Sequence, residues 1–153
     1  MAILGLALLL AHGAFAAAKR SGLGAAFGAL IARGVMGADG KPSQATIVSA
    51  LSNMANQLNK SMPMTINADT RLDNILASPT SPKFTYNYTL NASLQEINAA
   101  NFFGQMKPTL VKGVCTNPDM KIFTENGVTV GYSYRAKDGS FAGKIEVSPS
   151  DCR

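Results

Sequence analysis

The sequence predicts an α+β domain: a four-stranded antiparallel sheet covered on one face by helices, preceded by an apolar N-terminal helix. Three patterns predict it. Residues 43–62 carry apolar side chains at the helical period, residues 84–90 and 128–134 alternate between apolar and polar positions, and residues 2–18 hold no charge. Period-two alternation is typical of strands with one buried face, which helices must cover. The expected element order is α-β-β-α-β-β.

The first expected helix opens at Pro42 and Ser43. Its apolar residues form a single stripe made of Ile47, Val48, Leu51, Met54, Ala55 and Leu58. A stripe of this period is typical of a helix that packs one face on a core. Met62-Pro63 should end the helix, because the residue before a proline disfavours the helical conformation.

Two strands are expected next, over residues 64–77 and 84–90, separated by a turn that contains two prolines. In the first strand, one face should hold Ala68, Thr70, Leu72, Asn74 and Leu76. In the second, the apolar face should hold Phe84, Tyr86, Tyr88 and Leu90. Successive strand side chains point to opposite faces, so each set should lie together.

A second helical region should follow from residue 93 to 114. Ser93 and Glu96 match a capping box, in which each residue satisfies a backbone N–H of the other. Pro108 should kink this helix or split it in two, because proline removes a helical hydrogen bond.

The chain should then close with a helical turn and two strands. The turn is expected at residues 119–124 and should end at Asn126-Gly127, a helix-terminating signal. The strands are expected over 128–134 and 141–147, joined by a turn at Lys137-Asp138-Gly139.

The chain divides into three predicted parts. Residues 1–37 are interpreted as a signal peptide or membrane anchor, residues 38–42 as a linker, and residues 43–153 as an extracytoplasmic domain. Ala14-Phe15-Ala16 fits the small-x-small pattern of a signal-peptidase site. The alternative is a retained membrane helix, since the uncharged run of residues 2–18 reaches the lower limit for a span.

A weakly apolar stretch follows Lys19 and Arg20, in which Gly24 and Gly28 would permit close helix packing in a membrane. Arg33 interrupts it, so it is a poor spanning helix and a better interfacial or hairpin partner. Cleavage after Ala16, or two short spans, would place the domain outside the cytoplasm. The predicted location is the periplasmic side of a bacterial inner membrane, or the periplasm or medium after cleavage.

Composition excludes several classes of activity. The only histidine, His12, lies in the apolar leader, so the domain has no Ser-His or Cys-His nucleophile pair and no histidine zinc site. No phosphate-binding glycine motif is present, and the sequence indicates no cofactor and no metal. The net charge of +5, without a basic run, indicates no nucleic-acid partner.

The two cysteines, Cys115 and Cys152, are interpreted as a disulfide, which would tie down the C-terminus of an exported domain. The alternative is a pair of buried free thiols. If the disulfide forms, the two Cα atoms must lie within about 7 Å.

Asp69, Arg71 and Asp73 are the weak candidate for a ligand or partner contact. At alternate positions of a strand their side chains would point the same way, and Arg71 could clamp a carboxylate. The alternative is an exposed ion-pair row that keeps the strand soluble. No catalytic residue is predicted.

Four tyrosines could form a second feature: Tyr86, Tyr88, Tyr132 and Tyr134. They could stack on bases or sugars, but their alternation with polar residues favours a position in the core under the helices. Their hydroxyls would then reach the sheet edge or a partly open cavity, which is the one small-molecule hypothesis.

Three stretches resemble a group of uncharacterised bacterial domains found behind a signal peptide or membrane helix. They are NKSMPMTINADTRLDN from Asn59, FTYNYTL from Phe84 and CTNPDMKIFTENGVTVGYSY from Cys115. The resemblance covers nearly all of residues 43–152. The layout is also similar to cystatin-like and NTF2-like helix-on-sheet folds, which implies a fold and no particular activity.

The favoured function is therefore a non-enzymatic interaction module of the cell envelope, such as an accessory subunit of a membrane complex. Its partners would be the membrane, through the N-terminal segment, and another envelope protein. The alternative is a small-ligand-binding or enzymatic domain with a cavity between helix and sheet. A deep pocket with converging polar groups would favour the alternative; a filled core would favour the module.

Overall fold

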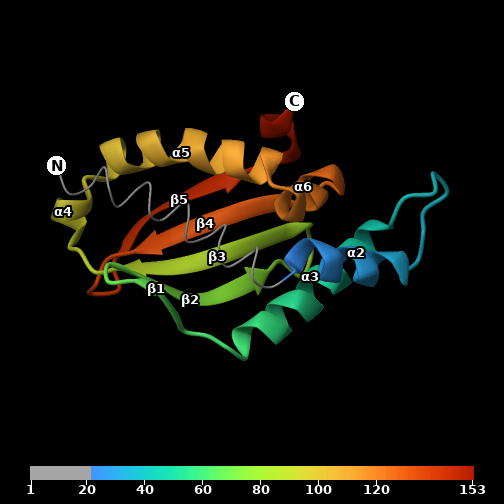
Figure 1. Cartoon of the computed structure of the whole chain (residues 1–153), viewed down its shortest axis with the longest axis horizontal. Coiled ribbons are helices and arrows are strands. Elements are labelled where there is room, and N and C mark those ends of the chain that lie inside the picture. The colour runs from blue at the N-terminus through green and yellow to red at the C-terminus, as the bar shows by residue number, and fades with distance from the viewer. Residues whose placement is uncertain (1–21) are drawn as a thin grey trace.

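The structure, a computed structural model, describes residues 22–153. The predicted leader of residues 2–18 and its Ala14-Phe15-Ala16 site lie outside the described residues. Figure 1 shows one twisted sheet, with α5 running beside β5 at one edge and α3 beside β1 and β2 at the other edge. Helix α4 lies at one end of the molecule, and α2 and α6 lie toward the other.

The sheet has five strands in the order β1-β2-β3-β4-β5, where four were predicted. Their bounds are β1 Met64–Asn67, β2 Thr70–Ala77, β3 Lys83–Leu90, β4 Thr129–Arg135 and β5 Phe141–Val147. The fifth strand arises because residues 64–77, predicted as one strand, form a hairpin folded at Ala68 and Asp69. Strand β1 pairs antiparallel with β2 and forms one edge of the sheet.

Strands β3 and β4 are parallel, so the prediction of a purely antiparallel sheet is wrong. Three helices connect these strands: α4 (Leu94–Ile97), α5 (Ala99–Thr116) and α6 (Pro118–Glu125). Parallel neighbours require a crossover of a dozen or more residues, and the helices supply it. The other three strand pairings are antiparallel, so the sheet is mixed.

Strand β2 changes face part-way along, at a register shift between Leu72 and Asn74. Beyond the shift Ile75 is buried, whereas Leu76 is 58 % exposed. The prediction had placed Leu76 on the same face as Leu72. One extra residue in a strand turns every following side chain to the opposite face, so simple alternation assigned the second half of β2 incorrectly.

Helix α3 (Gln44–Asn59) starts where the sequence indicated, and the Ser43 hydroxyl accepts a hydrogen bond from the Thr46 N–H at 3.2 Å. The second helical region also forms, with the predicted capping box at Ser93. It divides at Asn98, which has a φ of 43°, and Pro108 lies inside the continuous helix α5. Pro108 therefore does not split the helix, and the division falls at Asn98 instead.

A further helix, α2 (Leu23–Ala32), packs on the same core. Phe27 is fully buried and stacks on Phe123 of α6, with ring centroids 4.7 Å apart. Gly24 lies so close to α6 that a Cβ atom there would come within 2.8 Å of the Asp119 Cα. The packed unit thus includes residues that the sequence assigned to the leader. None of the helices within residues 22–153 is long and apolar enough to cross a membrane.

Candidate functional site

One face of the sheet is packed under helices, and the opposite face, called here the open face, carries polar side chains in cross-strand rows. In one row Thr89 of β3 lies between Arg71 of β2 and Arg135 of β4. The next row consists of Asn74, Asn87, Ser133 and Lys144. Each of these residues is exposed or half-buried. The open face is therefore mostly polar and partly basic, and it also carries two exposed apolar residues, Leu76 opposite Thr85 and Phe141 opposite Arg135.

The predicted Asp69/Arg71/Asp73 row is only partly assembled. The Arg71 Nε lies 2.5 Å from a carboxylate oxygen of Asp73, whose second oxygen accepts a hydrogen bond from the Thr89 hydroxyl at 2.5 Å. Asp69 lies in the turn between β1 and β2, and its backbone N–H is bonded to the Asn67 side chain at 2.9 Å. The Arg71 side chain remains 54 % exposed. The carboxylate of Asp73 thus holds the guanidinium at the surface, and Asp69 is not part of the pair.

A polar hollow of about 290 Å³ lies beside this pair, at the end of the sheet. Its charged lining residues are Asp69, Arg71 and Lys137, and its neutral polar ones include Thr65, Thr89 and Asn91. The nearest anion to the Lys137 ammonium is Glu96, at 3.8 Å. The hollow is wide and shallow, because most of its lining residues are exposed.

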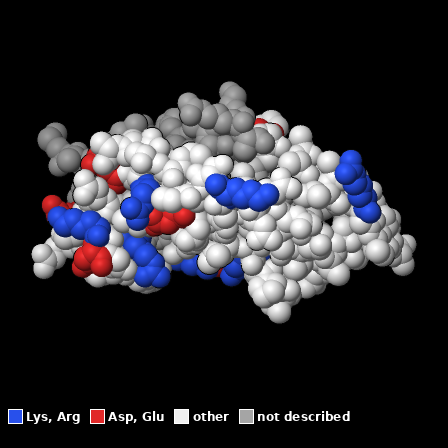
Figure 2. Space-filling view, turned by 90° about the horizontal axis from the view of Figure 1, so that it is seen from below, with Lys and Arg blue, Asp and Glu red and all other residues white. Residues whose placement is uncertain are grey.

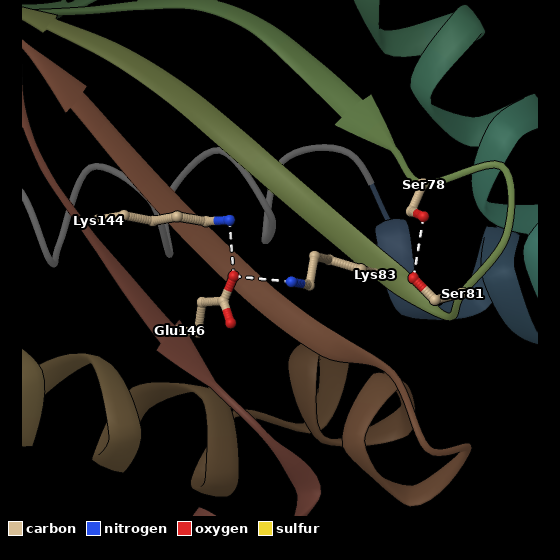
Figure 3. A network of polar contacts seen from close by, with 5 residues as sticks. All are labelled: Ser78, Ser81, Lys83, Lys144 and Glu146. Carbon is tan, nitrogen blue, oxygen red and sulfur yellow. Dashed lines mark hydrogen bonds and ion pairs between the residues drawn. The ribbon is translucent and has the colours of Figure 1, made fainter.

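Sequence reasoning missed a second charged cluster on the open face. Glu146 of β5 accepts from Lys83 of β3 at 2.8 Å and lies 2.6 Å from the Lys144 ammonium (Figure 3). Lys83 lies opposite Thr129 and Glu146 opposite Gly131, so the ion pair runs diagonally across β4. Both lysines lower the pKa of Glu146 below its ordinary value through hydrogen bonds and charge.

Asp73 and Glu146, the two carboxylates of the open face, are each paired with cations. Asp73 is held by Arg71 and Thr89, and Glu146 by two lysines. A general acid or base needs a pKa near the working pH, and the lowered pKa of Glu146 moves away from it. Within residues 22–153 no group of acidic, cysteine or histidine side chains is placed to hold a metal ion.

The four tyrosines lie on the covered face, as their alternation predicted. Tyr86 stacks on Tyr132 and Tyr88 on Tyr134 across β3 and β4, with ring centroids 5.6 and 5.4 Å apart. All four are at most 2 % exposed. The hydroxyls of Tyr86, Tyr88 and Tyr132 have no hydrogen-bond partner among the described residues, and burial raises the pKa of each. The stack is a packed core layer, with no open stacking surface.

The cysteines are joined. Cys115, near the end of α5, and Cys152, in the final turn Pro149–Cys152, form a disulfide with Cα atoms 5.3 Å apart. This satisfies the separation that the sequence prediction required. The bond ties the C-terminus to the helix layer, on the side of the sheet opposite the open face.

Solved structures share this fold at low sequence identity. A Pseudomonas aeruginosa protein described as a candidate secreted protein matches with a TM-score of 0.61 and 18 % identity, over 70 % of this chain and 93 % of that one. EpsS, the pilotin of the Vibrio vulnificus type 2 secretion system, matches with a TM-score of 0.57 and 15 % sequence identity. The match covers 72 % of this chain and 94 % of EpsS. AspS, the type II secretion system pilotin of Vibrio cholerae, matches with a TM-score of 0.54 and 17 % sequence identity. The match covers 71 % of this chain and 94 % of AspS.

Sequence comparison adds the family. Among curated proteins, none matches the chain. Residues 47–141 match a family described as a domain of unknown function, DUF8479. The match runs from α3 through the whole crossover to the first residue of β5, so it covers most of the sheet and the open face. The chain belongs to the DUF8479 family.

Proposed function

We propose that this chain is a non-enzymatic interaction module of a bacterial cell envelope, acting as an accessory subunit of a membrane complex. The observation that carries the proposal is the shared fold with two secretion-system pilotins and a candidate secreted protein. The disulfide adds support, because such bonds persist in oxidising compartments outside the cytoplasm. By this proposal the domain is exported, with residues 2–18 serving as a cleaved signal or a retained anchor.

The open face is the proposed contact for a protein partner. It presents four cationic side chains, Arg71, Lys83, Arg135 and Lys144, against two carboxylates that are already paired. The surplus of positive charge favours a partner surface with acidic residues. Short threonine, serine and asparagine side chains in the centre would allow close approach and hydrogen bonding.

The packed tyrosine layer supports this proposal over a ligand-binding or enzymatic domain. That alternative requires a cavity between helix and sheet, where the tyrosines are almost fully buried. The two carboxylates of the open face are also already paired with cations.

Photo-crosslinking in cells tests the proposal. A photoreactive phenylalanine derivative at Asn87, at the centre of the open face, should yield a discrete adduct with another envelope protein. The matched control places it at Gln105, which is exposed on α5. Adducts of equal size and yield at both positions, or none at Asn87, would contradict the open face as the contact.

A further inference from the structure

The N-terminal part of the described chain is poor in charge. Residues 22–68 contain four charged side chains, Arg33, Asp39, Lys41 and Lys60, whereas residues 69–153 contain seventeen. Helices α2 and α3 contain none. Figure 2 shows the contrast from one side: coloured side chains gather toward the end that carries α4, and the α2 end is mostly white. The sheet region keeps an ordinary charged surface, and the α2–α3 region does not.

The loop between α2 and α3 extends beyond the body of the molecule, at the end opposite α4 (Figure 1). It presents Val35 at 74 % exposure, the most exposed large apolar residue among residues 22–153, next to Met36 at 50 %. The loop is held by its own bonds. The Val35 carbonyl accepts from the Ser43 N–H at 3.0 Å and from the Thr46 hydroxyl at 2.8 Å. The two apolar side chains are therefore displayed by an ordered loop.

Apolar surface continues from this loop along the crevice between the two helices. One hollow of about 460 Å³ is lined by Leu30, Val35, Ala45 and Ala50 together with Arg33, Gly34 and small polar residues. A second, of about 290 Å³, is lined by Leu23, Ala26, Met54 and Leu58 among others. The two hollows share Leu30, and exposed apolar residues at one end of a molecule are typical of a site that contacts an apolar medium or partner.

Chain connectivity and charge indicate what binds at the α2–α3 surface. The uncharged segment ends at Ala18, and five residues on, Leu23 begins α2. Five residues span at most about 18 Å, so if the segment lies in a bilayer, α2 lies near its surface. Among residues 22–59, the α2–α3 region has two basic residues, Arg33 and Lys41, and one acidic residue, Asp39, and in the sequence Lys19 and Arg20 directly follow the uncharged segment. Basic side chains at a bilayer surface are attracted to anionic lipid headgroups.

We infer that the α2–α3 end of the domain docks on an anionic phospholipid bilayer, with Val35 and Met36 entering the boundary between headgroups and acyl chains. The inference rests on the proposed envelope location and on a retained N-terminal segment. The open face, at the sheet, stays free for a protein partner. Apolar residues beside basic ones are the usual composition of surfaces that lie in the membrane interface.

A tryptophan reporter tests the inference, because the chain contains no tryptophan. The full chain with Met36→Trp is mixed with vesicles of phosphatidylglycerol and phosphatidylethanolamine. Its emission should shift to shorter wavelength, and lipids brominated along the acyl chain should quench it. Val35→Trp serves as a second reporter should the first variant fold poorly. The matched control is Leu94→Trp, 43 % exposed on α4 at the other end, whose emission should not change.

The outcomes separate this inference from the proposed function. Vesicle binding by the full chain with an unchanged emission spectrum of the Met36→Trp variant would overturn loop docking and leave the envelope module intact. Equal shifts for Met36→Trp and Leu94→Trp would also overturn it, because they would report general unfolding on lipid. Replacing both Arg33 and Lys41 with glutamine should weaken the shift on anionic vesicles and not on phosphatidylcholine. An equal effect on both lipids would overturn the anionic lipid as the occupant.

Discussion

The α2–α3 region and the sheet with its crossover helices share one core and differ in surface. Phe27 of α2 stacks on Phe123 of α6, and Phe123 stacks on Phe84 of β3, so one aromatic chain crosses both regions. Outside the core, the first region has two helices without a charge, and the second has paired charges on an open face. The difference teaches that composition alone does not decide whether a segment packs on the core. Helix α2 has the uncharged composition of a leader, yet it packs on the same core as the sheet.

The largest expected effect comes from the contact that joins the two regions. Phe27→Ala should lower the free energy of unfolding by about 3–5 kcal/mol, because it removes a fully buried ring and leaves a cavity. Chemical denaturation of the purified protein measures the change. Ala26→Ser, at an exposed position on the same helix, is the control and should change it by less than about 0.5 kcal/mol. A loss below about 1 kcal/mol for Phe27→Ala would mean that α2 is not part of the folded unit.

The disulfide should have the next largest effect, and it acts within the second region alone. Replacing Cys115 and Cys152 with alanine should cost about 3–4 kcal/mol, because a bond across a sequence separation of 37 residues restricts the unfolded chain. Denaturation of the native chain with and without reductant gives the same comparison. Reductant should not affect the double variant. Equal stability of oxidised and reduced native protein would contradict a stabilising bond.

A substitution in the tyrosine layer should not lower the free energy of unfolding, unlike the two changes above. Tyr132→Phe removes a buried hydroxyl that has no hydrogen-bond partner among the described residues. The free energy of unfolding should therefore stay the same or rise by up to about 1 kcal/mol. Burial raises the pKa of Tyr132 above its ordinary 10.0, so the unfolded chain ionises first as the pH rises. The native protein should therefore lose stability above pH 10, and Tyr132→Phe should lose less. A clear loss of stability in Tyr132→Phe at pH 7 would show that the hydroxyl is bonded.

Removing the Arg71 side chain should change little. The Arg71 side chain is 54 % exposed, and exposed ion pairs contribute less than about 1 kcal/mol to stability. Arg71→Ala should therefore lower the free energy of unfolding by less than about 1 kcal/mol. Thermal or chemical denaturation measures it. Arg135→Ala, also exposed and on the same cross-strand row, is the matched control. A loss of several kcal/mol specific to Arg71 would mean that this pair is structural, and the open face would lose its best-defined contact residue.

The smallest expected effect is the acid dependence of Glu146. Its pKa is lowered by Lys144 and Lys83, so the unfolded chain takes up the proton first when the pH falls below the ordinary 4.5. The stability that Glu146 contributes is present above that pH and is lost below it. The stability difference between the native chain and Glu146→Gln, under about 1 kcal/mol for so exposed a cluster, should therefore shrink in acid. A difference that stays constant from pH 6 to 3 would contradict the pairing.

Local patterns predicted the individual elements well. The apolar stripe indicated α3, the capping residue Ser43 marked its start, and strict alternation placed the tyrosines of β3 and β4 inward. These features depend on residues close together in sequence, where helical and strand periods act directly. The sequence also allowed the Arg71–Asp73 pair, because residues two apart on a strand share a face.

Features set by long-range pairing escaped the sequence analysis. The turn at Ala68-Asp69 carries no glycine or proline, so the β1–β2 hairpin was predicted as one strand and Asp69 was grouped with Arg71. The parallel pairing of β3 with β4 could have been inferred from the helical connection, since long crossovers favour parallel neighbours. The contact of Lys83 with Glu146 depends on that pairing and joins residues 63 apart. It could not be predicted from local patterns.

One measurement tests the central claim most directly. If the chain is an envelope protein, a reporter fused after Arg153 that is active only outside the cytoplasm should be active in cells. A paired fusion to a reporter active only in the cytoplasm should be silent. The disulfide should also be found oxidised in the cell extract when thiols are trapped during lysis. The reverse result, an active cytoplasmic reporter with reduced Cys115 and Cys152, would contradict the envelope location and with it the proposed function.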